Sequence, residues 1–370
     1  MPEIKLKNIT KRFGKALAVD NLSMTIKDGE FVSLLGPSGC GKTTTLRMIA
    51  GLETPSEGEI YIDDRCVFSS KQAIDVSPDK RDVGFLFQNY ALWPHMTVYK
   101  NISFGLENMK WDKKAIDERV HELVKMLKIE EFLERYPSEL SGGQQQRVAI
   151  ARTLSTGPKV LFMDEPLSNL DAKLRMEMRT ELKRLHIETG ATFVYVTHDQ
   201  LEAMTLSTKI CLLKEGLLQQ YQPPLEVYRN PSNYFVADFV GAPNINIIEV
   251  EGTTVNIDEV KLTNPSINLL FSPLSKVVSI SENQKLLLGI RPEDIQIEKE
   301  GDFEAEVYST LPSGMETIVK LKIKDIILTS VVFGDVDFDI GSKIKVSFPN
   351  DRYILFDKET ENQLANGKLS

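Results

Sequence analysis

A glycine-rich loop constrains the fold of this chain more than any other feature. The loop fits the pattern G-x-x-x-x-G-K-[ST] and runs Gly36-Pro37-Ser38-Gly39-Cys40-Gly41-Lys42-Thr43. An apolar run, residues 31–35, precedes it, and the segment 44–50 that follows has a helical pattern. A strand, this loop and a helix in that order form a phosphate-binding turn at the end of a strand, so the loop predicts an α/β fold. A glycine-rich turn that binds nothing is the alternative.

The loop residues have distinct expected roles. The glycines let the backbone amides turn inward around the α- and β-phosphates, and the helix N-terminus behind them favours negative charge. Lys42 supplies a cation to the β/γ oxygens, and the Thr43 hydroxyl is expected to bind Mg²⁺. We therefore predict ATP and Mg²⁺ as ligands, and the expected ATP-binding residues of the loop are Gly36, Pro37, Ser38, Gly39, Cys40, Gly41, Lys42, Thr43 and Thr44.

Apolar patterning indicates several layers before residue 240. Residues 4–26 alternate polar and apolar side chains, as strands of a half-exposed antiparallel layer do. The runs 31–35, 159–163 and 192–196 are almost continuously apolar, which is typical of a parallel sheet covered on both faces. Helical stripes lie between these runs, formed by Ile116, Val120, Leu123, Val124 and Leu127 and by Leu174, Met178, Leu182 and Leu185.

The pattern changes near residue 240. Pro223-Pro224, Pro231 and Gly241-Ala242-Pro243 interrupt the helical periodicity, and short strands separated by turn residues follow. Segments 319–324 and 344–348 alternate cleanly. We place a domain boundary at residues 241/242 and predict a small β-barrel or sandwich over residues 242–370.

Charge and hydropathy exclude some classes of partner and location. The formal net charge of −9 gives no electrostatic footprint for wrapping nucleic acid, so we expect no nucleic-acid partner. The N-terminus lacks an apolar signal region, and no stretch approaches the roughly 18 apolar residues that span a bilayer. We expect a cytoplasmic chain that is neither secreted nor integral to a membrane.

Two adjacent carboxylates, Asp164-Glu165, follow the apolar run 159–163. A carboxylate at such a strand end can hold Mg²⁺ through water, and a second can orient or deprotonate an attacking water. Standing alone, the pair would more simply be a solvated strand end. Beside a phosphate loop, it indicates hydrolysis.

A second glycine-rich helix start lies at residues 140–144. Leu140-Ser141-Gly142-Gly143-Gln144 precedes a helical pattern that Ser141 caps, and its two glycines leave backbone amides open to an anion. Because one ATP needs only one phosphate loop, we expect this start to serve another nucleotide. An ordinary helix N-cap is the alternative.

Together these segments resemble the nucleotide-binding subunits of ABC transporters. The matching segments are the phosphate loop, Gln88 in 86–88, LSGGQ at 140–144, Asp164-Glu165, Ser168-Asn169-Leu170-Asp171 and His198 in 197–199. The resemblance covers residues 3–241. It implies an ATPase domain over residues 1–241, with a RecA-like core, an antiparallel β subdomain and a helical subdomain at about residues 89–158.

The resemblance implies roles for single residues. Phe13 stacks on adenine, although a strand-packing Phe is the alternative. Glu165 is the general base, His198 contacts the γ-phosphate, and Gln88 senses Mg²⁺ and the attacking water. Asp171 lies in the segment that crosses the dimer interface. The implied catalytic residues are Glu165, His198 and Gln88, and the implied Mg²⁺ ligands are Thr43, Gln88 and Asp164.

The resemblance also implies partners. Two copies face head to tail, so that each ATP lies between one copy's phosphate loop, with Asp164, and the other's Ser141, Gly142, Gly143 and Gln144. Two transmembrane permease subunits dock near Gln88–Val98, for which a helical-subdomain core is the alternative. An extracytoplasmic solute-binding protein acts through them, and the C-terminal domain offers a place for a regulatory protein. The chain is then peripheral, on the cytoplasmic face of the cell membrane.

Three stretches narrow the class of transporter. Residues 90–98, 198–205 and 289–294 are similar to the carbohydrate-importer ATPases of the maltose type, whose C-terminal regulatory domain is an OB-like (TOBE) barrel. Sugars or oligosaccharides are thus the favoured solutes, with polyamine, iron and sulfate importers as alternatives.

Soluble ABC ATPases that act on DNA or ribosomes form a rival class. Only about a hundred residues without sustained heptads separate Gly36 from Ser141, and the chain has one ATPase domain, which disfavours both. A nucleotide sensor that does not hydrolyse is disfavoured by the presence of Glu165 and His198.

Overall fold

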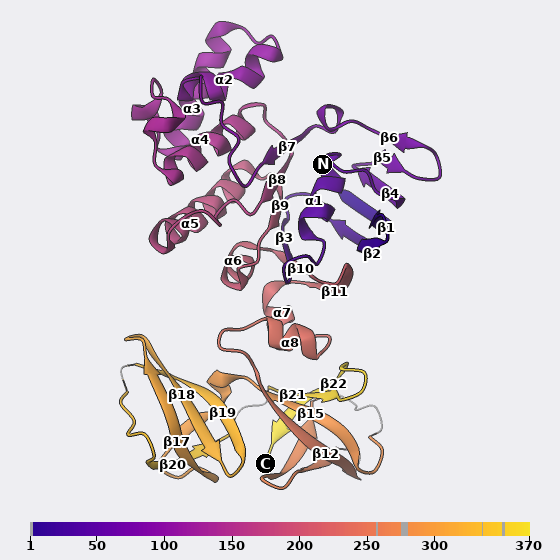
Figure 1. The fold of residues 1–370 in the computed structure, drawn as a ribbon, viewed down its shortest axis with the longest axis vertical. Helices are drawn as coiled ribbons and strands as arrows, with labels where there is room; N and C mark the ends of the chain where they lie inside the picture. The colour runs from indigo at the N-terminus through magenta and orange to yellow at the C-terminus, as the bar shows by residue number, and fades with distance from the viewer. Residues whose placement is uncertain (1–2, 257, 275–279, 335, 350–351) are drawn as a thin grey trace. The chain divides into compact units, whose positions relative to one another are not determined.

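The computed structural model describes residues 3–256, 258–274, 280–334, 336–349 and 352–370. By its own internal contacts the chain divides into unit 1, Met1–Pro224, and unit 2, Leu225–Ser370 (Figure 1). In the part of the chain that the structure describes, no helix is both long and apolar enough to cross a membrane.

A six-stranded sheet forms the centre of unit 1. Its order is β11-β10-β3-β9-β8-β7, and β11 alone runs antiparallel to its neighbour. Every residue of β3, β8 and β9 is buried, because both faces of the sheet are covered. The predicted strands at 31–35, 159–163 and 192–196 are confirmed to within one residue. The strands are β3 (Phe31–Leu35), β7 (Val83–Leu86), β8 (Val160–Asp164), β9 (Thr192–Val196), β10 (Lys209–Lys214) and β11 (Leu217–Gln222).

An antiparallel sheet with order β2-β1-β4-β5-β6 forms the second layer of unit 1. Its strands are β1 (Ile4–Phe13), β2 (Ala16–Ile26), β4 (Glu57–Ile62), β5 (Arg65–Ser69) and β6 (Ile74–Asp75). The alternation in residues 4–26 corresponds to this half-exposed layer, since Ile4 and Leu6 are buried and Lys5 lies between them.

Helices complete unit 1. They are α1 (Lys42–Ala50), α2 (Val98–Asn108), α3 (Lys113–Leu127), α4 (Gly142–Ser155), α5 (Ala172–Thr189) and α6 (Gln200–Leu206), with short 3-10 helices η1 (Pro78–Lys80), η2 (Glu130–Phe132) and η3 (Pro137–Glu139). In Figure 1, α2, α3 and α4 gather into a cluster, here called the helical cluster, away from the antiparallel sheet. The stripes predicted at 116–127 and 174–185 are the buried faces of α3 and α5.

Alternation along the central strands gives unit 1 two cores. Leu161 and Met163 of β8 pack with the helical cluster and α5, whereas Val160 and Phe162 of the same strand pack with α1 and the antiparallel sheet. Successive side chains of a strand point to opposite faces, so each face of the sheet receives its own cover.

Unit 2 begins with two short helices and continues as β-structure. The helices are α7 (Pro224–Arg229) and α8 (Tyr234–Phe239), and η4 (Pro292–Asp294) is a single 3-10 turn. A closed barrel has the order β12-β13-β14-β22-β21-β15, and a second sheet has the order β16-β20-β17-β18-β19. The predicted α/β unit followed by an all-β barrel is confirmed. The strands are β12 (Asn246–Asn256), β13 (Glu259–Thr263), β14 (Asn268–Pro273), β15 (Gln284–Ile290), β16 (Gln296–Glu298), β17 (Phe303–Pro312), β18 (Glu316–Ile323), β19 (Ile326–Phe333), β20 (Lys343–Ser347), β21 (Tyr353–Asp357) and β22 (Gln363–Leu369).

The division between the units lies before the boundary that the sequence places at residues 241/242. Arg291, buried at the end of β15, donates to the carbonyls of Ala237 and Val240 at 2.9 and 2.6 Å. Arg291 also donates to the Tyr228 carbonyl at 2.9 Å, and its guanidinium carbon lies 4.0 Å from the centre of the Tyr228 ring. These bonds fix α7 and α8 to the barrel, which is why they belong to unit 2.

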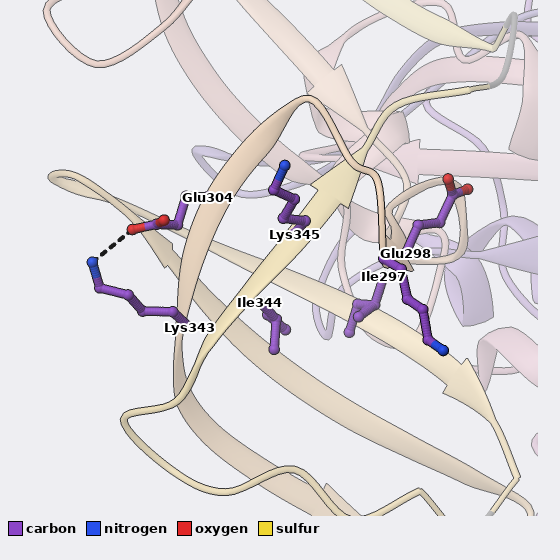
Figure 2. Close-up of a pocket in the computed structure, with 7 residues that line it drawn as sticks. Ile297, Glu298, Glu304, Lys343, Ile344 and Lys345 are labelled. Atoms are coloured by element: carbon purple, nitrogen blue, oxygen red, sulfur yellow. Dashed lines mark hydrogen bonds and ion pairs between the residues drawn. The ribbon is translucent and has the colours of Figure 1, made fainter.

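A shallow cavity of about 520 Å³ lies on the second sheet of unit 2, beside β16, β17 and β20 (Figure 2). Lys343 and Glu304 form an exposed ion pair of 2.7 Å there. Exposed pairs of this kind contribute little stability. Because the charged side chains are exposed and of both signs, the cavity is a solvated sheet face. Its lining residues are Ile297, Glu298, Lys299, Glu304, Lys343, Ile344 and Lys345.

Candidate nucleotide-binding site

The glycine-rich loop links β3 to α1, and two of its glycines have no room for a side chain. Gly36 and Gly41 have φ angles of 146° and 99°, in the region that favours glycine. A Cβ on Gly41 would lie 2.4 Å from the carbonyl oxygen of Ala18, and one on Gly36 would lie 2.2 Å from that of Leu213. The sequence pattern therefore reflects close backbone approaches on both sides of the loop.

The loop surrounds a cavity of about 260 Å³. Lys42 is 6% exposed, and its ammonium group donates to the carbonyls of Gly36 and Pro37 at 2.7 and 2.8 Å. Cys40, also in the loop, is buried, and burial raises the pKa of its thiol. The lining residues are Ala18, Ser38, Gly39, Gly41, Lys42, Thr43, Thr44 and Glu165. Ala18 was not predicted; it lies here because the β1–β2 hairpin approaches the loop.

Thr43 and Asp164 meet at the loop. The Thr43 hydroxyl donates to Asp164 Oδ1 at 3.0 Å, and Arg47 donates to Asp164 Oδ2 at 3.2 Å. Arg47 was missed by sequence reasoning, although it lies one helical turn after Thr43 on α1 and so shares its face. A hydroxyl beside a carboxylate is a donor set that suits Mg²⁺ when substrate phosphates supply further oxygens. Among the described residues, no three His, Cys, Asp or Glu side chains form a metal-binding group by themselves.

Glu165 and His198 meet at the carboxyl ends of neighbouring strands. The parallel register of β8 and β9 pairs Asp164 with Val196, and Glu165 N donates to the Val196 carbonyl at 3.1 Å. This register leaves Glu165 Oε2 3.3 Å from Nδ1 of His198. Glu165 has a φ of 46°, uncommon for a residue with a side chain, and Ser168 supports it by donating to its carbonyl at 2.8 Å.

Gln88 follows β7, the edge strand next to β8. Its side chain is exposed and donates to Ser168 Oγ at 3.3 Å, and its carbonyl accepts from Asn169 Nδ2 at 3.1 Å. Gln88 is thus joined to the segment after Glu165, while the hydrogen bonds of Thr43 and Arg47 to Asp164 lie elsewhere in the site.

Phe13 ends β1 in the hairpin that also carries Ala18. Its side chain is 50% exposed, and the Lys11 ammonium lies 4.7 Å from the ring centre. A Phe packed inside the strand layer, the alternative for this residue, does not describe this position. Half of the ring is therefore open to a flat ligand.

The second glycine-rich start lies at α4. Ser141 Oγ accepts from Gln144 N at 3.4 Å, and Gln144 Oε1 accepts from Ser141 N at 2.8 Å. Cβ atoms on Gly142 and Gly143 would meet side-chain atoms of Leu170 and Leu174, at 3.6 and 2.7 Å. Asp171 caps α5 by accepting from Leu174 N at 3.0 Å. The described lining of the loop cavity contains none of residues 141–144.

Comparison with known proteins is consistent with this geometry. Residues 19–168 match the family model ABC transporter, and residues 288–356 match the TOBE domain. The trehalose/maltose import ATP-binding protein MalK of Thermococcus litoralis is 44% identical, over 97% of this chain and 99% of that protein. The xylose/arabinose import ATP-binding protein XacK of Haloferax volcanii is also 44% identical, over 100% of this chain and 97% of that protein.

The chain belongs to the ABC transporter family. Among solved structures, a dimeric post-hydrolysis state of the ATP-binding cassette MJ0796 bound to ADP and Pi covers 60% of this chain and 98% of its own, with 37% identity and a TM-score of 0.52. The resemblance drawn from the sequence is confirmed. The chain is an ABC ATPase, with ATP as its substrate, followed by a TOBE domain.

Behind the candidate site, this ABC ATPase has a buried carboxyl group that sequence reasoning missed. Glu202 is 4% exposed, and Tyr195 Oη and Thr197 Oγ1 donate to its Oε2 at 2.7 and 2.6 Å. Burial raises the pKa of Glu202, and its two hydroxyl partners oppose that shift. Glu202 lies on α6, and these two bonds tie that helix to the end of β9, directly before His198.

Proposed function

We propose that this ABC ATPase is the motor subunit of an importer for sugars or oligosaccharides. The approach of Glu165 to His198 at the wall of the loop cavity carries the hydrolytic part of the proposal. The solute class is supported by several relatives that share nearly the full length and are named as sugar or oligosaccharide import ATP-binding proteins.

Each side chain of the site has a proposed task. Backbone amides of residues 38–44 bind the phosphates of ATP, and Lys42 balances their charge. The Phe13 ring stacks on adenine. Glu165 accepts a proton from the attacking water, and His198, 3.3 Å away, orients that carboxylate and contacts the γ-phosphate.

Thr43, Asp164 and Gln88 are the proposed Mg²⁺ residues. When bound, Mg²⁺ neutralises charge on the phosphate oxygens. Thr43 and Asp164 lie together, at 3.0 Å, which supports the first two assignments. Gln88 is joined instead to Ser168, and we propose that it connects the segment after Glu165 to residues 89–98, which follow Gln88 in the chain.

A head-to-tail homodimer completes the proposed site. The residues Ser141, Gly142, Gly143 and Gln144 are absent from the described lining of their own chain's cavity, as is expected if they act on the partner's ATP. A two-fold axis then gives both sites the same composition, because each subunit contributes the same two surfaces. The related cassette MJ0796 has been solved as a dimer, which supports this arrangement.

The remaining partners follow from the import function. We propose that two permease subunits dock on Gln88–Val98, here called the docking segment. Its residues Ala91, Pro94 and His95 are exposed, whereas Tyr90 and Val98 are buried in the core of the helical cluster. An extracytoplasmic solute-binding protein acts through the permeases. Unit 2 offers a surface to a regulatory protein. Binding to the permeases places the chain on the cytoplasmic face of the membrane. From the family resemblance we propose domains at residues 1–241 and 242–370, so α7 and α8 end the proposed ATPase domain in sequence although they pack within unit 2.

The test uses the complex that co-purifies with the tagged chain from its native membranes, reconstituted into vesicles. We expect maltotriose or xylose, with the extracytoplasmic protein present, to raise ATP turnover, while spermidine and ferric citrate do not. In Glu165→Gln this turnover should fall about 10²-fold or more, since a general base contributes at least that factor. ATP binding should persist and trap a stable dimer, seen by size-exclusion chromatography.

Glu134→Gln is the matched control, because Glu134 is an exposed glutamate in the turn after η2, outside the proposed site. Its turnover should equal that of the wild type. Normal turnover in Glu165→Gln would remove Glu165 from the mechanism, and stimulation by spermidine or iron instead of sugars would overturn the solute class.

A further inference from the structure

The docking segment is held by an arginine near the far end of α4. Arg152 lies in the last turns of this helix, and its Nη1 and Nη2 atoms donate to the carbonyls of Ala91 and Tyr90 at 2.5 and 2.8 Å. Its guanidinium carbon lies 4.9 Å from the ring centre of Trp93. One side chain of α4 therefore contacts three residues of the docking segment.

The backbone that Arg152 holds has an uncommon conformation. Tyr90 and Ala91 have φ angles of 60° and 47°, two consecutive non-glycine residues in the left-handed region. Such a pair persists only where the surroundings fix it from several sides. The Tyr90 ring is buried in the core of the helical cluster, and Arg152 fixes the two carbonyls.

The helical cluster holds the next residues as well. Trp93 packs on Phe104 of α2, with ring centres 4.5 Å apart, and Asn101 donates to the carbonyls of Trp93 and Met96, each at 3.1 Å. Gln88, only two residues before Tyr90, is bonded to Ser168 instead. The docking segment thus begins on the catalytic side of unit 1 and continues on the helical cluster.

Helix α4 connects the docking segment to the second glycine-rich start. It runs from Gly142 to Ser155, with Ser141 as its N-cap, so Ser141 and Arg152 lie at opposite ends of one rigid element. Val148, Ala149, Ile150 and Ala151 are fully buried between those ends. A displacement of the docking segment would therefore move the Ser141 end with it, since a packed helix moves as a body.

The chemistry of this contact requires arginine. The carbonyls of Tyr90 and Ala91 accept from two nitrogens of one planar guanidinium, which also lies over the Trp93 ring. A lysine ammonium cannot form this two-pronged contact. Burial lowers the pKa of the Arg152 guanidinium, and the two carbonyls and the Trp93 ring face its charge there.

We propose that Arg152 is a positioning residue that couples the docking segment to the Ser141 end of α4, and thereby passes permease movement to the partner's ATP. The inference rests on the proposed permease docking. Arg152 touches neither the loop cavity nor Glu165, so its effect appears in the response to the permeases rather than in the chemistry of the isolated chain.

The experiment compares ATP turnover of the isolated chain with that of the co-purified permease complex in vesicles. Arg152→Met removes both hydrogen bonds and should reduce the stimulation by the complex about tenfold or more, since the loss of one charge-assisted hydrogen bond already accounts for about tenfold. Turnover of the isolated chain should stay within about twofold, and Arg152→Lys should give an intermediate stimulation because it keeps the charge without the fork. Arg147→Met is the matched control: Arg147 lies on the same helix and donates to the Leu127 carbonyl at 3.4 Å, outside the docking segment, so stimulation should be unchanged.

A second measurement keeps the test valid if Arg152→Met folds poorly. The chain has two tryptophans, so Trp111→Phe leaves Trp93 as the only indole. In that background Arg152→Lys should shift the Trp93 emission of the isolated chain, with no permease needed. Separately, Trp93→Phe in the otherwise unchanged chain should reduce stimulation by the complex.

The outcomes separate this inference from the proposed function. If the complex stimulates the wild type and the Arg152 and Trp93 variants equally, Arg152 has no coupling role, although permease docking stands. If the complex fails to stimulate the wild type, the proposed permease function fails and the inference fails with it.

Discussion

Unit 1 contains two glycine-rich helix starts, at α1 and α4, and they are built in opposite ways. At α1, Gly41 is the N-cap with a left-handed φ of 99°, and among the described residues no side chain caps the helix. Lys42 instead folds back onto the Gly36 and Pro37 carbonyls. At α4, Ser141 and Gln144 form a reciprocal capping box.

The difference shows how one helix feature can serve two purposes. The first amides of an α-helix lack partners within the helix, and either a side chain or a ligand anion satisfies them. At α1 no side chain of the described residues caps the helix and so competes with a phosphate. At α4 the capping box already satisfies the amide of Gln144, so this start binds an anion less readily by itself. The α1 start is suited to organise ATP, and the α4 start to complete a site organised elsewhere.

The sharpest test of that contrast disables one start in each of two subunits. Lys42→Ala homodimers and Ser141→Arg homodimers should each lose about 10²-fold or more in turnover, because each lacks an electrostatic element of both sites. Mixing the two variants should restore one of the two sites in every heterodimer, since the intact loop of one subunit meets the intact Ser141 of the other. ATP turnover measured against the mixing ratio checks this.

Mixing each variant with more of itself is the control, and it should restore nothing. Undiminished turnover in either homodimer would break the contrast, because the α4 start or the loop lysine would then be dispensable.

A matched pair of glycine substitutions probes the two starts structurally. In Gly41→Ala the new Cβ would lie 2.4 Å from the Ala18 carbonyl oxygen at a left-handed φ, whereas in Gly142→Ala it would lie 3.6 Å from Leu170. We expect Gly41→Ala to lower the free energy of unfolding by about 2 kcal/mol and to abolish ATP binding. Gly142→Ala should change that free energy by less than about 0.5 kcal/mol, the range for sites without strain. Urea unfolding and ATP titration distinguish the two, and equal losses would mean that both starts are equally constrained.

Local patterns explain why much of unit 1 could be predicted from the sequence. Gly36 and Gly41 of the loop are required by backbone approaches on either side of it, and the apolar runs at β3, β8 and β9 by burial on both faces of the sheet. Asp164 and Glu165 follow one of these runs directly. The proximity of Glu165 to His198 also follows, because the ends of adjacent parallel strands meet at one edge of the sheet.

Contacts made across the fold could not be predicted in this way. Arg47 reaches Asp164 from α1, and Glu202 lies buried behind His198, yet each has the sequence signature of an ordinary helix-surface residue. The division between the units depends on Arg291 binding carbonyls more than fifty positions earlier. Sequence patterning marks where helical periodicity ends, and it does not show which unit a short helix packs against.

The smallest expected effect concerns the capping box itself. Ser141→Ala removes the acceptor for Gln144 N, and we expect it to lower the free energy of unfolding by about 1 kcal/mol, the usual value of an N-cap. It should also reduce turnover of the homodimer about tenfold, if the hydroxyl contributes one hydrogen bond to the partner's ATP. Thermal unfolding and ATP turnover, measured on the same preparation, give both values.

Asp112→Ala provides the comparison, since Asp112 caps α3 by accepting from Lys114 N at 2.9 Å and has no place in the proposed nucleotide site. It should lose a similar amount of stability while turnover of the folded protein stays unchanged. If turnover of Asp112→Ala fell as much as that of Ser141→Ala, the α4 start would have no role beyond that of an ordinary helix cap. Loss of turnover confined to Ser141→Ala would instead show that the hydroxyl has a second partner, which the single chain does not supply.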